Sequence, residues 1–84
     1  MNQVLMRLVV ENIAFLELSS DKAVDPDVAV RELEGIAAQL QRLSASERSE
    51  FLRFVREVMI PEARGSGDEA RAALFSRLQS DMGW

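Results

Sequence analysis

The segment from Gln3 to Leu18 constrains the fold of this chain most, because its pattern predicts a helix with apolar side chains on most of its sides. One broad stripe at helical spacing consists of Leu5, Leu8, Val9, Ile13 and Leu16. Other apolar side chains fall well outside that stripe: Val4, Val10, Phe15 and Leu18. Such a helix is either the central element of a fold, or it packs on its own domain with one face and on another subunit with the other.

Asn12 is the polar residue inside this apolar stripe, because successive helical residues are rotated by about 100°. Two interpretations follow. Asn12 is either a hydrogen-bonded amide in the core or a polar contact that sets the register across a dimer seam. Glu11, which borders the stripe, is expected to pair with Arg7 one turn earlier.

The start of the second helix is the clearest boundary in the sequence. Asp25 is a good N-cap residue, and Pro26 follows it at the first helical position. We therefore predict a helix over residues 26–43. Its apolar residues recur at spacings of three and four, which predicts one buried face made of Val30, Leu33, Ile36, Ala37, Leu40 and Leu43.

Two further helices are predicted in the second half of the chain. Ser44 and Glu47 have the spacing of a capping box, which starts a helix over 45–60 that should stop or kink before Pro61. Because the connection at residue 44 is short, we expect this helix to be an antiparallel neighbour of the preceding one. A flexible hinge at Gly65–Gly67 then leads to a last helix over 68–81, which Gly83 terminates.

These elements predict an all-α fold, a small bundle of three to four helices with an antiparallel helical hairpin core, in one domain over 1–84. A chain of 84 residues buries a modest fraction of its surface, and with no cysteine and no histidine it lacks disulfides and the best metal ligands. Self-association or a partner is the remaining source of stability. We therefore expect a homodimer, with the last helix packed across the core or onto a partner.

The charge of the chain is unevenly distributed. Seven carboxylates lie between Glu11 and Glu34, opposed only by Lys22 and Arg31, and the whole chain carries a net charge of −4. This negative charge argues against binding to nucleic acid or anionic lipid, and it favours binding to a basic partner. The predicted partner-binding residues are Glu17, Asp21, Asp25, Asp27, Glu32 and Glu34. Helix capping already explains two of them, Asp25 and Asp27, and the alternative for all six is a solvated face that keeps the protein soluble.

Catalytic, cofactor and metal sites are not predicted. The stretch from Asp21 to Asp27 lacks the ligand spacing and the glycine of a calcium loop. Without histidine or cysteine, the serines have no adjacent base for nucleophilic catalysis. The glycines at 65 and 67 lack the lysine of a phosphate loop, and the arginines at 48, 53 and 56 alternate with glutamates, which favours pairing within the helix over contacts with DNA.

We therefore predict a non-catalytic protein that binds another protein. Bacterial immunity proteins, which neutralise a toxin by covering its basic cleft, are similar to this chain in size, charge and lack of catalytic groups, although no motif is shared. The alternative is a structural or adaptor subunit that uses the apolar faces of the first and last helices. Nine arginines against one lysine are typical of a GC-rich bacterial genome. Charged residues interrupt the apolar N-terminal segment, unlike a signal peptide, so a cytoplasmic location is expected.

Overall fold

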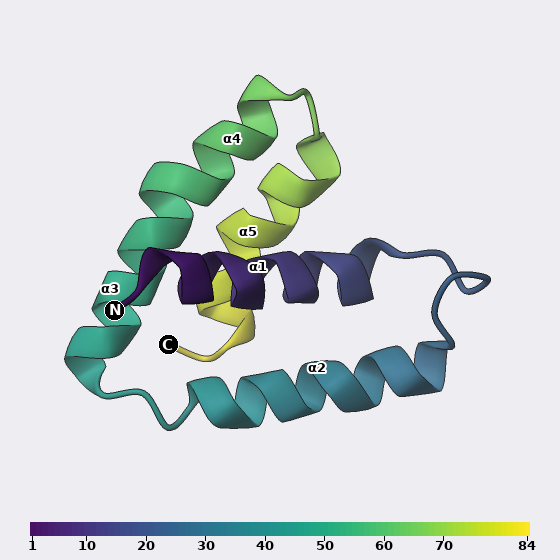
Figure 1. Cartoon of the computed structure of the whole chain (residues 1–84), viewed down its shortest axis with the longest axis horizontal. Helices are drawn as coiled ribbons and strands as arrows, with labels where there is room; N and C mark the ends of the chain where they lie inside the picture. Colours follow the sequence, from purple (N-terminus) through teal and green to yellow (C-terminus); the bar gives the residue numbers. More distant parts are fainter.

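Four helical rods form the protein, as shown by a computed structural model that describes all 84 residues. The helices are α1 (Gln3–Leu18), α2 (Pro26–Leu40), α3 (Ala45–Phe54), the π-helical segment η1 (Val55–Met59), α4 (Ile60–Gly65) and α5 (Glu69–Asp81). Because α3, η1 and α4 follow one another without a break, they form a single rod (Figure 1). The predicted all-α bundle is confirmed. None of the helices has the length and apolar character needed to cross a bilayer.

The predicted helix starts are satisfied by side-chain caps. The Asp25 carboxylate accepts from the backbone N–H groups of Asp27 and Val28, at 2.9 and 3.3 Å. Ser44 and Glu47 form the reciprocal capping box. Asp68 caps α5 by accepting from the Arg71 backbone N–H at 3.0 Å. Local hydrogen bonding therefore sets where each of these helices begins.

The arrangement of the helices differs from the predicted antiparallel pairing of the second and third. α2 ends at Leu40 rather than at residue 43, and it runs antiparallel to α1, whereas α3 turns away from it (Figure 1). The chain leaves α2 through a turn, and the extended backbone of Ser44 (ψ 166°) redirects it. The Arg48 guanidinium donates to the Gln41 carbonyl oxygen at 2.7 Å and fixes this angle. The two hairpins of the fold are α1–α2 and α4–α5.

The third helix was predicted to stop or kink before Pro61, and it does not stop there. The Ile60 N–H bonds to the Val55 carbonyl five residues earlier, so the helix widens by one residue just before Pro61. The wider π-helical turn accommodates the missing N–H of proline, and the rod continues to Gly65.

The predicted hinge at Gly65–Gly67 is a hydrogen-bonded turn. Gly65 still belongs to α4, and Gly67 adopts a φ of +77°, which glycine tolerates best. The Asp68 N–H donates to the Ala63 carbonyl at 2.9 Å, and the Ser66 hydroxyl donates to the same oxygen at 3.0 Å. This turn folds α5 back along α4 (Figure 1).

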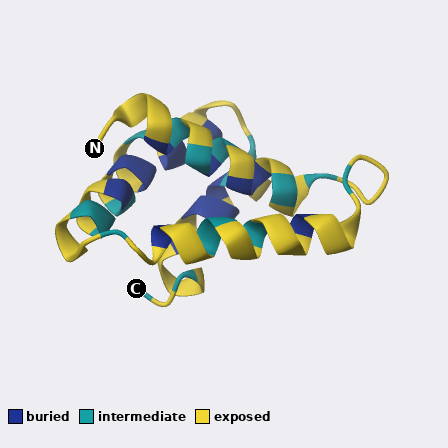
Figure 2. Ribbon diagram, turned by 60° about the horizontal axis from the view of Figure 1, so that its bottom comes forward, coloured by how far each residue is buried: buried dark blue, intermediate teal, exposed yellow.

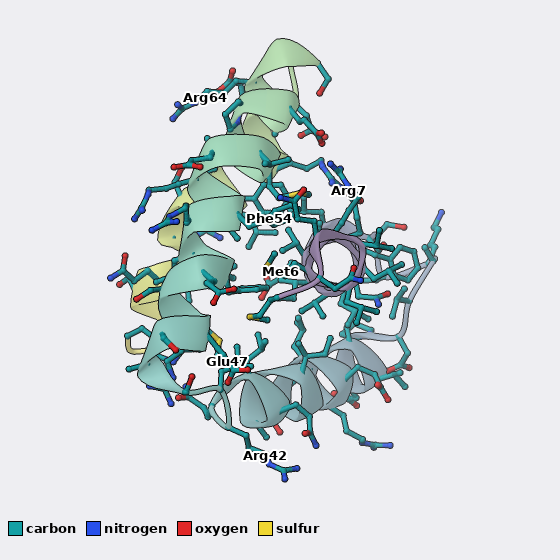
Figure 3. The ribbon with its side chains drawn as sticks, turned by 60° about the vertical axis from the view of Figure 1, so that its left-hand side comes forward. Met6, Arg7, Arg42, Glu47, Phe54 and Arg64 are labelled. Atoms are coloured by element: carbon teal, nitrogen blue, oxygen red, sulfur yellow. The ribbon has the colours of Figure 1, made fainter.

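The core lies between α1, the α3–α4 rod and α5. In Figure 3, where α1 is seen almost end-on, Met6 and Phe54 point into the space between these elements. α5 packs on this core, with Ala72, Leu74, Phe75 and Leu78 buried. α2 contributes little, since only Ala29 and Leu40 are buried, and most of it is exposed in Figure 2. Val30, predicted to be buried, is exposed.

The predicted inner face of α1 is also corrected by the structure. Leu5 and Leu8, expected in the core, are exposed, and Val10, placed outside the stripe, is completely buried. The buried face consists of Met6, Val10, Ile13 and Ala14. Asn12 is exposed, so its interpretation as a core amide is wrong.

The last residue of the chain closes the other side of the core. The Trp84 ring meets Phe51 edge to face, with 6.3 Å between ring centroids, and its indole N–H donates to the Gln41 side chain at 3.0 Å. The Arg48 guanidinium lies over the same indole, 5.2 Å from its centroid. Trp84 thereby joins the turn after α2 to the start of α3.

The capping box of α3 gives a first testable prediction. The Ser44 N–H donates to the Glu47 carboxylate at 2.9 Å, and this bond holds the pKa of Glu47 below its ordinary value. The box therefore stabilises the fold fully above the ordinary carboxyl pKa, and its contribution is lost as the pH falls through the lowered pKa. We expect Ser44→Ala, which removes the hydroxyl cap, to cost about 1 kcal/mol at neutral pH.

Urea unfolding at pH 7 and pH 3 measures this effect, with Glu47→Gln as the control. Glutamine can still accept from the Ser44 N–H but does not titrate, so this variant should lose less stability on acidification than the parent protein. An unchanged pH dependence in Glu47→Gln would show that other carboxylates govern the acid transition.

Candidate protein-binding surface

Five large apolar side chains of α1 lie on solvent and define what we call the outer face: Val4, Leu5, Leu8, Phe15 and Leu18. Each is between 44% and 68% exposed. α1 lies in front of α5 in Figure 1, and no other ribbon covers its near side. The largest apolar patch of a typical monomer covers about 300–600 Å² and is often an association site. α1 is therefore apolar on two faces, and only one of them is used inside the protein.

Asn12 lies within the outer face, between Leu8 and Phe15 along the helix. Its amide is exposed to solvent, so of the two interpretations of this residue the contact across a subunit seam is the one that the structure leaves open. A single amide among apolar side chains is a known means of fixing one register in helix pairing.

Ion pairs tie one edge of the outer face to the rest of the fold. The Arg7 guanidinium donates twice to the Glu62 carboxylate, at 2.7 and 2.8 Å, and Arg71 donates to Glu11 at 2.8 Å. The bonds from Arg7 hold the pKa of Glu62 below its ordinary value. The predicted pair of Glu11 with Arg7 is therefore wrong, because α4 and α5 bring closer partners to both residues.

An apolar cleft of about 210 Å³ opens between α1, α2 and α5. Its walls include Ile13, Leu33, Ile36, Ala37, Leu40, Leu74, Leu78 and Met82. Three carboxylates also line it, Glu17 from α1, Glu34 from α2 and Asp81 from α5. The volume is below the roughly 300–1,000 Å³ typical of small-molecule sites. It suits one or two apolar side chains of a partner.

The six predicted partner-binding carboxylates are all exposed, but the fold divides them. Glu17 and Glu34 both line the cleft, whereas Glu32 lines a neighbouring groove that shares Ile36 and Leu40 with the cleft. Asp21 lies in the turn between α1 and α2, close in sequence to the capping residue Asp25 and to Asp27 in the first turn.

None of these six carboxylates takes part in an ion pair. The ion pairs of the protein engage other acidic residues instead, namely Glu11, Glu50, Glu62, Asp68 and Asp81. The end of the α1–α2 hairpin therefore carries several carboxylates without an ion-pair partner, with Lys22 as the one cation in the same turn. No three carboxylates gather in a way that could hold a metal ion.

One part of this surface, Asp81 at the cleft, was missed by the sequence prediction. Asp81 joins the rim of the cleft because α5 folds back, and no local signal brings it to Glu17 and Glu34. The outer face was visible only as a surplus of apolar residues in α1.

Comparison with known proteins gives no significant match to a family model, a curated protein or a solved structure.

Proposed function

We propose that this chain is a non-catalytic protein that acts by binding other proteins. The observation that carries the proposal is the outer face of α1, where five large apolar side chains remain in water although the fold buries the opposite face. Keeping such a patch exposed is unfavourable unless another protein surface covers it.

The most concrete form of this function is an acidic inhibitor of the immunity-protein kind, cytoplasmic and homodimeric, that covers the basic functional surface of a toxin or a similar partner. The unpaired carboxylates at the end of the α1–α2 hairpin support it, because they would attract and orient a basic surface. The cleft beside Glu17 and Glu34 would receive an apolar side chain flanked by lysine or arginine in the partner.

The alternative function is a structural or adaptor subunit held by apolar helix faces. The apolar faces of the first and last helices were considered for this function. The apolar face of the last helix, α5, is buried in the core, so only the outer face of α1 remains exposed. In this case the acidic hairpin end only solvates the protein.

Charge reversal distinguishes these two functions. We expect the double variant Asp21→Lys with Glu32→Lys to slow association with the partner at least about tenfold at low salt, because complementary charge acts mainly on the association rate. Both residues are exposed and neither caps a helix, so the fold should be unaffected. The measurement is surface plasmon resonance with the product of the neighbouring reading frame, or with a partner captured from the native cell.

The matched control is Glu57→Lys with Glu69→Lys. These residues are also exposed, and each double variant adds four charges to the net charge of −4, two per substitution. Equal association rates for the two double variants would contradict the acidic docking surface and favour the adaptor.

A further inference from the structure

We propose that the outer face of α1 binds the outer face of a second copy of this chain, with the two α1 helices antiparallel about a two-fold axis between Glu11 and Asn12. This inference rests on the proposed interaction role of that face, and it names the partner that covers the face. It is separate from the acidic hairpin end, which stays free for another protein.

The order of side chains along α1 makes the face self-complementary in one register. When a two-fold axis passes between Glu11 and Asn12, Leu8 of one copy lies opposite Phe15 of the other. In the same register, Leu18 lies opposite Val4 and Leu5. Near the axis the two polar residues meet, so that the exposed Asn12 amide can donate to the carboxylate of Glu11 in the second copy.

The contacts of Glu11 within its own chain leave one of its carboxylate oxygens available to accept this hydrogen bond. Arg71 donates to one carboxylate oxygen, Oε1, at 2.8 Å, and no contact within the chain engages the other oxygen, Oε2. A register shifted so that Leu8 faced Glu11 would instead place the carboxylate against an apolar side chain. The polar pair therefore selects one alignment, as buried polar residues do in other helix pairs.

Charge favours the antiparallel direction. A parallel pair would place the hairpin ends of both copies together, with Glu17, Asp21 and Asp25 of each copy lying near their counterparts, and none of these carboxylates is neutralised by an ion pair. The antiparallel pair moves the two acidic ends to opposite sides of the dimer, and it also opposes the dipoles of the two helices.

The surface beside α1 extends the area that the second copy would cover. The outer face alone is smaller than the roughly 800 Å² per partner of a typical stable interface. Two grooves adjoin it, one lined by Val9, Gly35 and Ile36 and one lined by Met1, Leu5 and Phe51. The position of a Cβ on Gly35 has no atom within 4 Å, so this part of α2 is open to a neighbouring helix. α1 of the second copy can therefore rest on the α1–α2 seam.

The oligomeric state gives the first test. Light scattering at micromolar concentrations should give a mass twice the 9.4 kDa of the chain. Phe15→Glu should give the monomer mass with the helical circular dichroism unchanged, because Phe15 makes no core contact. The matched control is Val30→Glu on α2, similarly exposed but outside the outer face, and it should stay dimeric. A monomeric parent protein, or a dimeric Phe15→Glu, would overturn the inference.

Disulfide cross-linking tests the register, because the chain has no cysteine of its own. Asn12→Cys should cross-link to itself across the axis. Leu8→Cys and Phe15→Cys should each fail alone, since each residue lies about 10 Å along the axis from its counterpart, and cross-link only when the two variants are mixed. Cross-linking of Leu8→Cys alone would show a parallel pair and reject the proposal. Neither result alters the charge-reversal test, so the two hypotheses can fail independently.

Discussion

Replacing Val10 with aspartate is expected to unfold the protein, whereas Leu8→Asp should leave the monomer folded. Val10 is 0% exposed on the inner face of α1, and its neighbours in the core are all apolar. A carboxylate there would have no partner, and its burial should cost at least about 4 kcal/mol. That cost approaches the whole stability of an ordinary small domain, about 5–15 kcal/mol.

Leu8 is the matched position, because it lies two residues away on the same helix and is 55% exposed. Circular dichroism and urea unfolding of the two variants measure the difference directly. If Leu8→Asp unfolded the chain and Val10→Asp did not, α1 would be rotated by half a turn and the outer face would be the core. Leu8→Asp should also dissociate the proposed dimer, which light scattering reports separately from the fold.

The second large effect is expected for Phe51→Ala, which should cost about 3–5 kcal/mol of stability. Phe51 is completely buried on α3 and supports the Trp84 ring edge to face. Its removal would leave a cavity in the core, and it would also remove one of the contacts that hold Trp84. The expected result in urea is a large fall of the unfolding midpoint.

Phe15→Ala provides the contrast, since it deletes the same ring from a side chain that is 56% exposed. At concentrations too low for the proposed dimer to form, we expect a change within about 0.5 kcal/mol. At high concentration the same variant should lower the stability through weaker dimerisation. Equal costs for the two phenylalanines in dilute solution would contradict the burial described here.

Helix starts could be predicted from the sequence because they depend on local hydrogen bonds. Asp25 with Pro26, and Ser44 with Glu47, each satisfy backbone groups within a few residues, so no tertiary information is needed. The end of α3 could not be predicted in the same way. Pro61 normally ends a helix, and only the geometry of the widened turn at η1 shows that this one continues.

The inner face of α1 could not be chosen from periodicity. Both faces are apolar, so the stripe through Leu5 and Leu8 fits a helical pattern as well as the stripe through Met6 and Val10. The fold selects the second stripe because Phe54 and α5 lie on that side. Which side is inside is decided by the rest of the fold.

The acidic site was only partly predictable. Nearness in sequence brings Asp21, Asp25 and Asp27 close together, but it does not show that Glu34 lines the cleft and Glu32 the neighbouring groove. The direction of α3 relative to α2 could not be predicted from the sequence either, since it depends on a turn and on the long-range contacts of Arg48 and Trp84.

Trp84 also makes the protein easy to follow by optical methods. It is the only tryptophan and there is no tyrosine, so the emission of the chain above 300 nm comes from one indole at the junction of Gln41, Arg48 and Phe51. Fluorescence therefore reports the docking of the C-terminus, while circular dichroism reports the helices. If a variant lost the fluorescence signal at a lower denaturant concentration than the circular dichroism signal, its structure would be lost in steps, beginning with the contacts of Trp84.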